Sequence, residues 1–347
     1  GKKYAFDQYG AMVAEWSVDA DKKPSTSSAA STSTAEEQAK YSQAWRYYNS
    51  VEDGARVSKG WFKVVSAELL NEDKYNDDED SWYYADGSGH LYAGEFKTIK
   101  GKKYAFRNDG RMIDGLKFIK DEGTSLDVIA DDHDTFNFDN EDDFLDHAAE
   151  FYEPNGYKCF YFGDGDDGAM RTNKTNVEID GENHNFYFEK SGGNKGAGVT
   201  GEEDDKLYQS GMLLKADSDD KYIVVEKTSH YEGDKVKYTT YRKLDDAKEF
   251  MNADGVQVKD ELDGKNGNDA VNIGNGNTKK AEDLSEAYSI TYKDKDAKGD
   301  KKEYILVNTS GKIVDGKGKN KDGSDYYYVT EKKANGENSI VAIYVED

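Results

Sequence analysis

The chain has 347 residues, of which 71 are Asp or Glu and 47 are Lys or Arg, so its formal net charge is −24. This charge argues against binding to nucleic acid, because that affinity rests on Lys and Arg displacing counterions. No apolar run approaches the ~18 residues that a membrane-spanning helix needs. A single cysteine, Cys159, excludes an intrachain disulfide. Tyr is unusually frequent at 26 residues, beside 14 Phe and 4 Trp.

The chain contains an internal repeat. The sequence Gly-Lys-Lys-Tyr-Ala-Phe occurs at residues 1–6 and again at residues 101–106. The match continues with the pairs Gly10 and Gly110, and Met12 and Met112. Looser copies combine alternating aromatic residues, a polar turn with Gly and a short apolar strand; they begin near Trp45, Trp82, Cys159, Phe186, Tyr208 and Tyr304.

Each repeat is typical of a β-hairpin. Rings at alternate positions, such as Tyr104 and Phe106, lie on one face of a strand. The Asp, Asn and Gly residues that follow supply a turn, since Gly adopts positive φ without steric cost. A lone hairpin is marginally stable in water, so such units must stack on one another. The predicted fold class is mainly all-β, with stacked hairpin repeats forming an irregular β-solenoid that carries short helical insertions.

Insertions interrupt the repeats in chain order. Residues 18–34 have a flexible Ser/Thr/Ala composition, and Thr34 with Glu37 forms a capping-box pattern that opens a helix towards Tyr41. The acidic segment 66–81 begins with a predicted helical turn at residues 67–70. A further acidic segment contains a predicted helix at residues 140–152, capped by Asp139, with Phe144, Ala148 and Phe151 on one stripe; Pro154 and Gly156 end it.

Beyond Lys221 the pattern changes to longer strands. Residues 221–228 and 234–243 predict one hairpin, residues 287–293 and 301–308 a second, and residues 325–333 and 339–346 a third around Asn335-Gly336. A helical turn is predicted at residues 245–252, and the Gly/Asn-rich residues 264–277 predict a loop.

These patterns predict four regions. Residues 1–118 are hairpin repeats with an inserted linker at 18–43, and residues 119–157 are an acidic helical insertion. Residues 158–215 are degenerate hairpin repeats. Residues 216–347 are a C-terminal β-hairpin region and a candidate cap, which a terminal repeat needs.

The repeat around Gly101 resembles a known family. The run from Gly94-Glu-Phe96 through Gly101-Lys-Lys-Tyr104-Ala-Phe106 to Gly110-Arg-Met112 is similar to the cell-wall-binding repeat, also called the choline-binding repeat. It is most similar to the versions in clostridial toxin tails and glucan-binding proteins. The resemblance covers residues 1–16 and 44–118, with degraded copies to about residue 215. It implies a secreted or surface protein of Gram-positive-type bacteria whose hairpins bind teichoic-acid choline or carbohydrate.

The resemblance also implies ligand-binding residues. In the family, a ligand lies between the Trp after a Gly, the first Trp of the next strand and a Tyr of a further strand. Carried over, Trp16 with Trp45 forms one cleft and Trp61 with Trp82 a second. Tyr48 and Tyr84 are the candidate third walls. Phe96 holds the Trp position of the regular repeat, and its partner position holds Lys103.

Two interpretations of these rings stay open. A quaternary ammonium ion would gain cation–π energy over Trp or Tyr faces, and sugars stack on the same faces. The same tryptophans could equally be the core between stacked hairpins, which needs aromatic rings whatever its function.

The sequence offers little for catalysis, metals or cofactors. It has no HExxH, GxSxG or P-loop motif, and its five histidines are scattered. The Asp-rich residues 131–134, 164–168 and 294–299 lack the EF-hand spacing, so no metal and no cofactor is expected. Cys159 lies in an aromatic strand and is expected to be a small buried hydrophobe.

We therefore expect a non-enzymatic module that attaches a larger secreted protein to cell-wall choline or glycan. The alternative is a structural scaffold or adhesin whose insertions bind a protein partner. The chain opens inside a repeat without a signal peptide, so we expect a fragment, and secretion rests on the resemblance. The expected partners are cell-wall choline or carbohydrate and, in the alternative, a protein, with no nucleic acid and no membrane span.

Overall fold

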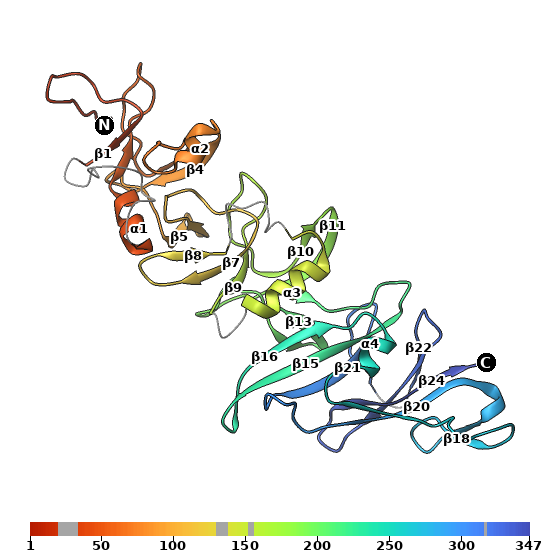
Figure 1. The fold of residues 1–347 in the computed structure, drawn as a ribbon. Coiled ribbons are helices and arrows are strands. Elements are labelled where there is room, and N and C mark those ends of the chain that lie inside the picture. The colour runs from red at the N-terminus through yellow and green to blue at the C-terminus, as the bar shows by residue number, and fades with distance from the viewer. Residues whose placement is uncertain (20–33, 130–137, 152–155, 316–317) are drawn as a thin grey trace. The chain divides into compact units, whose positions relative to one another are not determined.

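A computed structural model describes residues 1–19, 34–129, 138–151, 156–315 and 318–347 (Figure 1). The chain forms two compact units. Unit 1 comprises Gly1–Asn137 and Tyr157–Thr172, and unit 2 comprises Phe138–Gly156 and Asn173–Asp347. Three of the predictions fall on residues outside the described ranges: the flexible linker at residues 20–33, the Asp-rich residues 131–134 and the helix end at Pro154. The four predicted regions stay predictions.

Unit 1 is built from separate small sheets, as the hairpin repeats predict. Three of them are two-stranded: β1 (Trp16–Val18) with β2 (Trp45–Tyr47), β3 (Gly60–Val65) with β4 (Asp80–Ala85), and β5 (Glu95–Ile99) with β6 (Lys102–Phe106). The fourth has the order β8 (Leu126–Val128), β7 (Leu116–Asp121), β9 (Lys158–Tyr161). All pairs are antiparallel. No two copies of the repeat share one continuous sheet among these strands, which fits a stacked-hairpin solenoid.

Neighbouring hairpins of unit 1 pack through their rings. Trp16 of β1 lies 5.7 Å from Phe62 of β3, measured between ring centroids. Trp61 of β3 lies 5.7 Å from Phe106 of β6 in a stacked arrangement. Tyr83 of β4 is completely buried. A hairpin too small for its own core therefore buries its aromatic face against the next one, as predicted.

A single turn geometry follows the aromatic segments of the two best-matching repeats. In the first, the Gly10 N–H donates to the Asp7 carbonyl at 3.0 Å and the Asp7 N–H donates to the Ala11 carbonyl at 2.9 Å. A bridge between Phe6 and Met12 closes the turn. The second repeat has the same bonds from Gly110 and Arg107, and the bridge joins Phe106 to Met112. Gly10 and Gly110 have φ of 78° and 93°, which confirms the predicted role of Gly in the turn.

Two insertions of unit 1 contain helices. Helix α1 (Ala35–Gln43) begins after Thr34, whose side chain accepts a hydrogen bond from the Glu37 N–H at 3.1 Å, as the capping pattern predicts. Helix α2 (Glu72–Asn76) begins later than the helical turn predicted at residues 67–70, which is only a turn. The reason is a local cap: the Asn71 side chain accepts from the Lys74 N–H at 3.0 Å.

Unit 2 contains larger sheets. One has the order β10 (Asn173–Ile179), β11 (Glu182–Phe188), β14 (Met212–Leu213), β13 (Lys206–Gln209), β12 (Gly201–Glu203). A second has the order β16 (Lys235–Lys243), β15 (Tyr222–Glu232), β21 (Lys301–Asn308). A third has the order β17 (Val256–Asp260), β20 (Leu284–Tyr292), β24 (Asn338–Glu346), β23 (Tyr327–Lys332), β22 (Lys319–Lys321).

Two of the three C-terminal hairpins are confirmed and one is wrong. Strands β15 and β16 pair, as do β23 and β24. Strand β21, however, pairs with β15, whereas β20 pairs with β17 and β24, so residues 287–293 and 301–308 form no hairpin. The physical reason is that Ile290 of β20 and Leu306 of β21 belong to one buried cluster. The two strands lie in different sheets that share a core.

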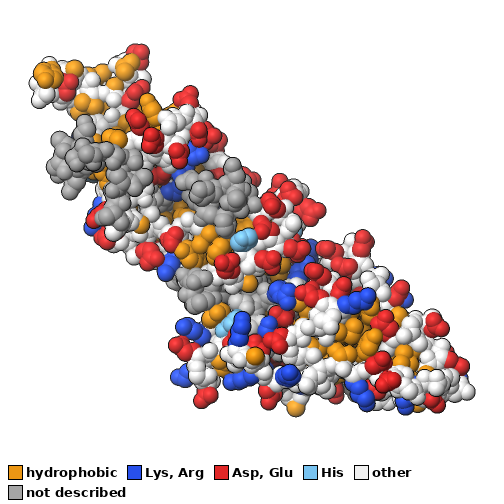
Figure 2. Space-filling view, in the orientation of Figure 1, with side chains coloured by type: hydrophobic (Ala, Val, Ile, Leu, Met, Phe, Trp, Pro, Cys, Tyr) orange, Lys and Arg blue, Asp and Glu red, His pale blue; other side chains and the backbone are white. Residues whose placement is uncertain are grey.

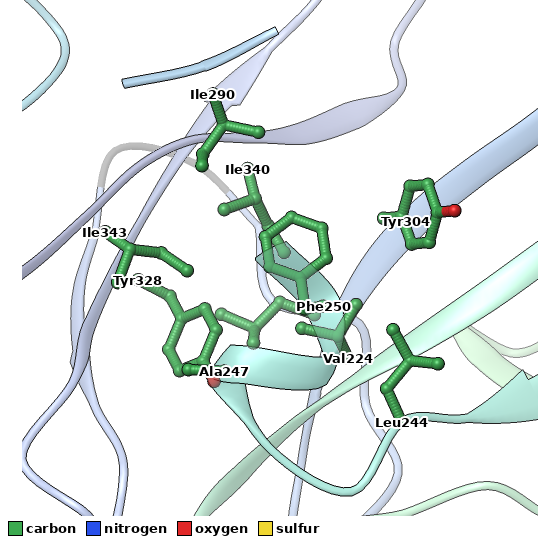
Figure 3. Close-up of a cluster of buried hydrophobic side chains, with 10 residues drawn as sticks. Val224, Leu244, Ala247, Phe250, Ile290, Tyr304, Tyr328, Ile340 and Ile343 are labelled. Carbon is green, nitrogen blue, oxygen red and sulfur yellow. The ribbon is translucent and has the colours of Figure 1, made fainter. Parts of the chain in front are cut away.

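That core is the centre of unit 2 (Figure 3). Helix α4 (Ala247–Met251), predicted as a helical turn, contributes Phe250, which is fully buried. Tyr304 of β21 lies 5.4 Å from the Phe250 ring. The predicted loop 264–277 contains β18 (Ala270–Asn272), which pairs with β19 (Thr278–Lys280) ahead of the 3₁₀ helix η3 (Ala281–Asp283). Val271 is fully buried and fixes this segment in a second cluster.

Helix α3 (Glu141–Phe151) realises the predicted acidic helix and belongs to unit 2. Its cap is Asn140, whose side chain accepts from the Asp143 N–H at 2.8 Å, so the prediction of Asp139 was wrong by one residue. Phe144 and Ala148 are fully buried, as the stripe predicts. Phe144 lies 5.4 Å from Phe186 of β11, so this stripe attaches the helix to a sheet of unit 2.

Candidate ligand-binding site

In the first predicted tryptophan pair, Trp45 lies in the core of unit 1 and the partly buried Trp16 packs against it. The rings of Trp16 and Trp45 are 6.1 Å apart and nearly perpendicular. The Trp16 indole N–H donates to the Val65 carbonyl at 2.8 Å. Trp45 is only 5% exposed, and Tyr41 of α1 lies 6.1 Å from its ring. The inserted helix therefore covers one side of this pair.

Tyr48, the candidate third wall of that pair, is 7% exposed. Its backbone N–H donates to the Glu15 carbonyl at 2.8 Å, next to Trp16. Trp16 also contacts Tyr83, with ring centroids 4.9 Å apart, and both belong to one buried cluster with Trp45. These contacts describe a packed core that leaves a ligand little ring surface.

The second pair lies at a surface that is only half-buried. The rings of Trp61 and Trp82 are 6.3 Å apart and nearly perpendicular. Tyr84 stands directly across the hairpin from Trp61 in the strand register, with its ring 5.1 Å away. The structure therefore brings together Trp61, Trp82 and Tyr84, which the sequence grouped.

Two further rings complete this surface, and the sequence analysis missed both. Tyr104 of β6 lies 4.8 Å from Trp61. Tyr92 stacks on Tyr84 with ring centroids 5.2 Å apart and planes within 8°. We call the five half-buried rings Trp61, Trp82, Tyr84, Tyr92 and Tyr104 the aromatic cluster.

The repeat itself could have revealed Tyr92. The turn after β4 repeats the geometry described above, and a bridge between Ala85 and Leu91 returns the chain beside its own strand. The Tyr92 N–H then donates to the Tyr84 carbonyl at 3.1 Å. Leu91 thus occupies the place of Met12 and Met112 in the other copies, so aligning turns would have placed Tyr92 beside Tyr84.

A buried floor supports the aromatic cluster. Ile99, Phe106 and Met112 lie beneath the rings, and Phe106 is fully buried. Burial raises the pKa of the Tyr92 and Tyr104 hydroxyls, so both stay neutral at physiological pH. The arrangement is a set of partly exposed, uncharged ring faces held by three segments of chain.

Charged groups border the aromatic cluster. Asp166 accepts from the Trp82 indole N–H at 2.8 Å and pairs with Lys63 Nζ at 2.9 Å. These hydrogen bonds, the one from Lys63 first, hold the pKa of Asp166 below its usual value. On the other side Lys97 Nζ pairs with Glu95 at 3.6 Å. Burial raises the pKa of Glu95 above its usual value.

The Phe96 position departs from the aromatic arrangement, as its sequence indicates. Lys103 stands in the place that Trp82 holds in the preceding hairpin, and its Nζ lies 5.1 Å from the Phe96 ring centroid. Phe96 packs against Phe160 of β9 at 5.2 Å. Unit 2 contains a groove of about 820 Å³, bordered by Lys293, Asp294, Lys302 and Glu303 among others.

Metal ligands, the single thiol and membrane-spanning helices were the remaining features to locate in the structure. In this part of the chain no three His, Cys, Asp or Glu side chains are grouped to hold a metal ion. Cys159 is 2% exposed, as expected of a buried hydrophobe, and burial raises the pKa of its thiol. No helix within the described ranges is both long and apolar enough to cross a membrane.

No family model and no curated protein matches the chain. Among solved structures, the chain is similar to choline binding protein F from Streptococcus pneumoniae, determined with a peptidoglycan analogue. The identity is 16% and the TM-score 0.33, over 61% of this chain and 43% of that one. CbpJ from Streptococcus pneumoniae gives 20% identity and a TM-score of 0.22, over 61% and 56%.

The modular autolysin LytC from Streptococcus pneumoniae is similar as well, with 17% identity and a TM-score of 0.16, over 61% of this chain and 45% of that one. The chain thus spans about half of the length of these proteins.

Proposed function

We propose that this chain is a non-catalytic module of the bacterial cell surface that attaches a larger secreted protein to the cell wall. Its ligand is choline of teichoic acid or a glycan. The observation that carries the proposal is the aromatic cluster: five half-buried rings from neighbouring hairpins over a buried floor. The attachment to a larger protein and the location at the cell surface rest on the resemblance of the repeat.

Partly exposed rings are chemically suited to either ligand. A quaternary ammonium ion over a Trp or Tyr face gains about 0.5–2 kcal/mol, depending on how far it is desolvated. A sugar buries its apolar face on the same ring. Stacking that served the fold alone would favour sealing these rings, as it does for Trp45. The half-buried state of Trp61 and Trp82 supports a binding role.

Only three of the six predicted residues belong to this proposal. Trp61, Trp82 and Tyr84 form the site together with Tyr92 and Tyr104. Trp45 and Tyr48 are almost completely buried, and the partly buried Trp16 packs against the same cluster as Trp45. In this proposal these three residues are therefore assigned to the packing between hairpins.

The charge of the chain bears on the ligand. A formal net charge of −24 attracts a cation through its mean field, although physiological salt screens this effect. Figure 2 shows acidic side chains spread over the visible face with basic ones among them. A cationic ligand is therefore favoured over an anionic one, and a neutral glycan is unaffected.

One observation favours the second candidate, a scaffold or adhesin whose insertions bind a protein partner. Helix α1, an insertion, places Tyr41 against Trp45, one ring of the pair that the repeat pattern would leave open. If the aromatic cluster bound no ligand, the repeats would serve only as a rigid support. The insertions, which in repeat proteins form loops on one face, would then be the surface that contacts a protein partner.

A titration distinguishes the two candidates. Tryptophan fluorescence of the whole chain is followed during addition of choline and, separately, of soluble glucan oligosaccharides. We expect a saturable change with one of them that is lost in Trp82→Ala and retained in Trp45→Phe, the matched core control. No saturable change with either ligand at tens of millimolar would reject the binding module and leave the scaffold.

A further inference from the structure

Lys63 stands directly across the hairpin from Trp82 in the register of β3 and β4. Its Nζ lies 5.9 Å from the centroid of the Trp82 ring, within the range of a cation–π contact. Asp166 completes the arrangement, because one of its carboxylate oxygens pairs with Lys63 Nζ and accepts from the Trp82 indole N–H. The chain thus places its own ammonium over the ring proposed to bind ligand.

The same combination recurs on the other side of the aromatic cluster. Lys97 Nζ lies 5.0 Å from the Tyr92 ring centroid and pairs with Glu95. Two rings of the cluster are therefore each covered by a lysine that is also held by a carboxylate. Trp61 and Tyr84 are instead covered by neighbouring rings.

The first hairpin shows what replaces the lysine when the ring is buried. Val18 stands opposite Trp45 there, in the position that Lys63 holds opposite Trp82. Trp45 is sealed beneath α1 and needs an apolar neighbour, whereas Trp82 stays half-exposed. Of these two hairpins, the one with a cation opposite the tryptophan is therefore the one whose tryptophan ring is partly exposed.

We propose that Lys63 is the specificity-determining residue of the aromatic cluster: a tethered cation that excludes quaternary ammonium ions from Trp82 and favours neutral glycans. This inference rests on the proposed binding function. A tethered group competes at an effective concentration of order millimolar, and a site that is free for only a fraction of the time has its apparent affinity reduced by that fraction.

The chemistry of the two cations explains the selectivity. The Lys63 ammonium uses its N–H groups on Asp166 while it lies near the ring. A quaternary ammonium has no N–H group, so it would displace Lys63 without replacing that hydrogen bond. A neutral sugar carries no charge that competes for the cation position, and its hydroxyls can accept hydrogen bonds from a lysine ammonium.

Lys63→Met tests the proposal, since Met keeps an unbranched stem without charge. Lys120→Met is the matched control: Lys120 is 42% exposed against 40% for Lys63, and it pairs with Glu122 at 3.5 Å. We expect Lys63→Met to lower the choline Kd by about fivefold or more, equivalent to a tethered cation occupying the ring about four-fifths of the time. The glucan Kd should stay within about twofold, and Lys120→Met should change neither.

Two further variants separate the ring from the carboxylate. Lys63→Arg keeps a cation and should bind choline as the unmodified chain does. The double variant Lys63→Met, Asp166→Asn should keep the gain in choline affinity, because the ring is still vacated. A gain that disappears when Asp166 is neutralised would assign it to the freed carboxylate and overturn the proposal.

The remaining outcomes are distinguishable. Equal choline binding by the unmodified chain and Lys63→Met overturns this inference and leaves the binding function standing. Absence of choline and glucan binding in every variant overturns both. A ligand-free measurement adds to these: in the NMR spectrum, the ring current of Trp82 should shift the Lys63 side-chain methylene protons upfield, and unshifted protons would overturn the proposal.

Discussion

In unit 1, Asp109 and Arg111 form an ion pair that is almost completely buried. Asp109 exposes 6% of its surface and Arg111 exposes 5%. Arg111 Nε donates to Asp109 Oδ2 at 2.8 Å, and the Asn71 side chain donates to the same oxygen at 2.9 Å. Burial by itself would raise the pKa of Asp109. The Arg111 charge and the hydrogen bonds from Asn71 and Arg111 outweigh burial and lower it.

We expect Asp109→Asn to destabilise unit 1 by about 3–5 kcal/mol, because removing one partner of a buried pair leaves the other charge uncompensated. The measurement is urea unfolding followed by tryptophan fluorescence, which reports on unit 1 alone because all four tryptophans lie there. The double variant Asp109→Asn, Arg111→Met should recover part of the loss. A loss of less than about 1 kcal/mol in the single variant would contradict the argument.

The same pair predicts a pH dependence. The folded-state pKa of Asp109 lies below its unfolded value, so its contribution is fully present above the unfolded pKa of about 3.9 and is lost as pH falls through the folded pKa. The unfolding free energy of the unmodified chain should therefore fall more steeply below about pH 4 than that of Asp109→Asn. If the unfolding free energies of the two proteins had the same pH dependence, the pKa of Asp109 would not differ between the folded and unfolded states, contrary to the prediction.

Cys159 allows a test of burial at one residue. It is 2% exposed on β9, and burial raises the pKa of its thiol, so the reactive thiolate is scarce and inaccessible in the folded state. We expect a thiol reagent such as Ellman's reagent to label the native chain at least about a hundredfold more slowly than the urea-unfolded chain. Rapid native labelling at neutral pH would mean that β9 detaches from β7.

At the scale of the element, one turn is used repeatedly in both units. An Asp or Asn side chain accepts hydrogen bonds from the backbone N–H groups two and four residues later. The acceptors of this kind are Asp7, Asp86, Asp296, Asn308 and Asp322. Four of these five turns have the sequence Asp/Asn-x-x-Gly, and Asp325 takes the place of the Gly after Asp322 with a φ of 72°. The turn is therefore set by a local sequence pattern.

Asp86 shows what such a turn contributes. Its carboxylate accepts from the Ser88 N–H at 2.7 Å and from the His90 N–H at 3.0 Å. We expect Asp86→Ala to destabilise unit 1 by about 1 kcal/mol in urea unfolding followed by tryptophan fluorescence. Asp86→Asn should retain most of the stability, because Asn308 makes the same bonds. An Asn variant as unstable as the Ala variant would exclude the side-chain acceptor as the cause.

Because such turns are local, the sequence predicts them well, and it predicts ring burial poorly. Phe6 and Phe106 occupy the same position in identical six-residue sequences, yet Phe6 is 64% exposed and Phe106 fully buried. The difference is Trp61 and Tyr92, which lie beside Phe106 and come from other segments. Likewise Trp45 and Trp82 look alike in sequence, and only the position of α1 decides that Trp45 is sealed.

At the scale of the whole chain, the two units solve the same problem differently. Hairpins in unit 1 stay separate and bury rings against the next copy, which the repeat spacing predicts. The longer strands of unit 2 join sheets of three and five strands around a core that includes Phe250 and Tyr328. The strands that pair with β20 and β21 could not be predicted from the sequence. Two consecutive strands of alternating apolar residues can pair with each other as a hairpin or lie in two sheets that pack face to face, and both arrangements have the same sequence pattern.

The whole chain also has one electrostatic property, its formal net charge of −24. An excess of one sign destabilises a compact state through self-repulsion, and raising salt from about 0.01 M to about 0.15 M shortens the Debye length from about 30 Å to about 8 Å. We therefore expect the thermal midpoint of unit 1, followed by tryptophan fluorescence, to rise with NaCl. Each ~1 kcal/mol of relieved repulsion corresponds to a few degrees.

Exposed ion pairs such as Lys120 with Glu122 oppose this trend, but each contributes only about 0–1 kcal/mol and is itself screened. The buried pair of Asp109 and Arg111 is screened much less than exposed pairs, so Asp109→Asn should show the same salt slope as the unmodified chain. If the midpoint instead fell with salt, local ion pairs would outweigh the net charge.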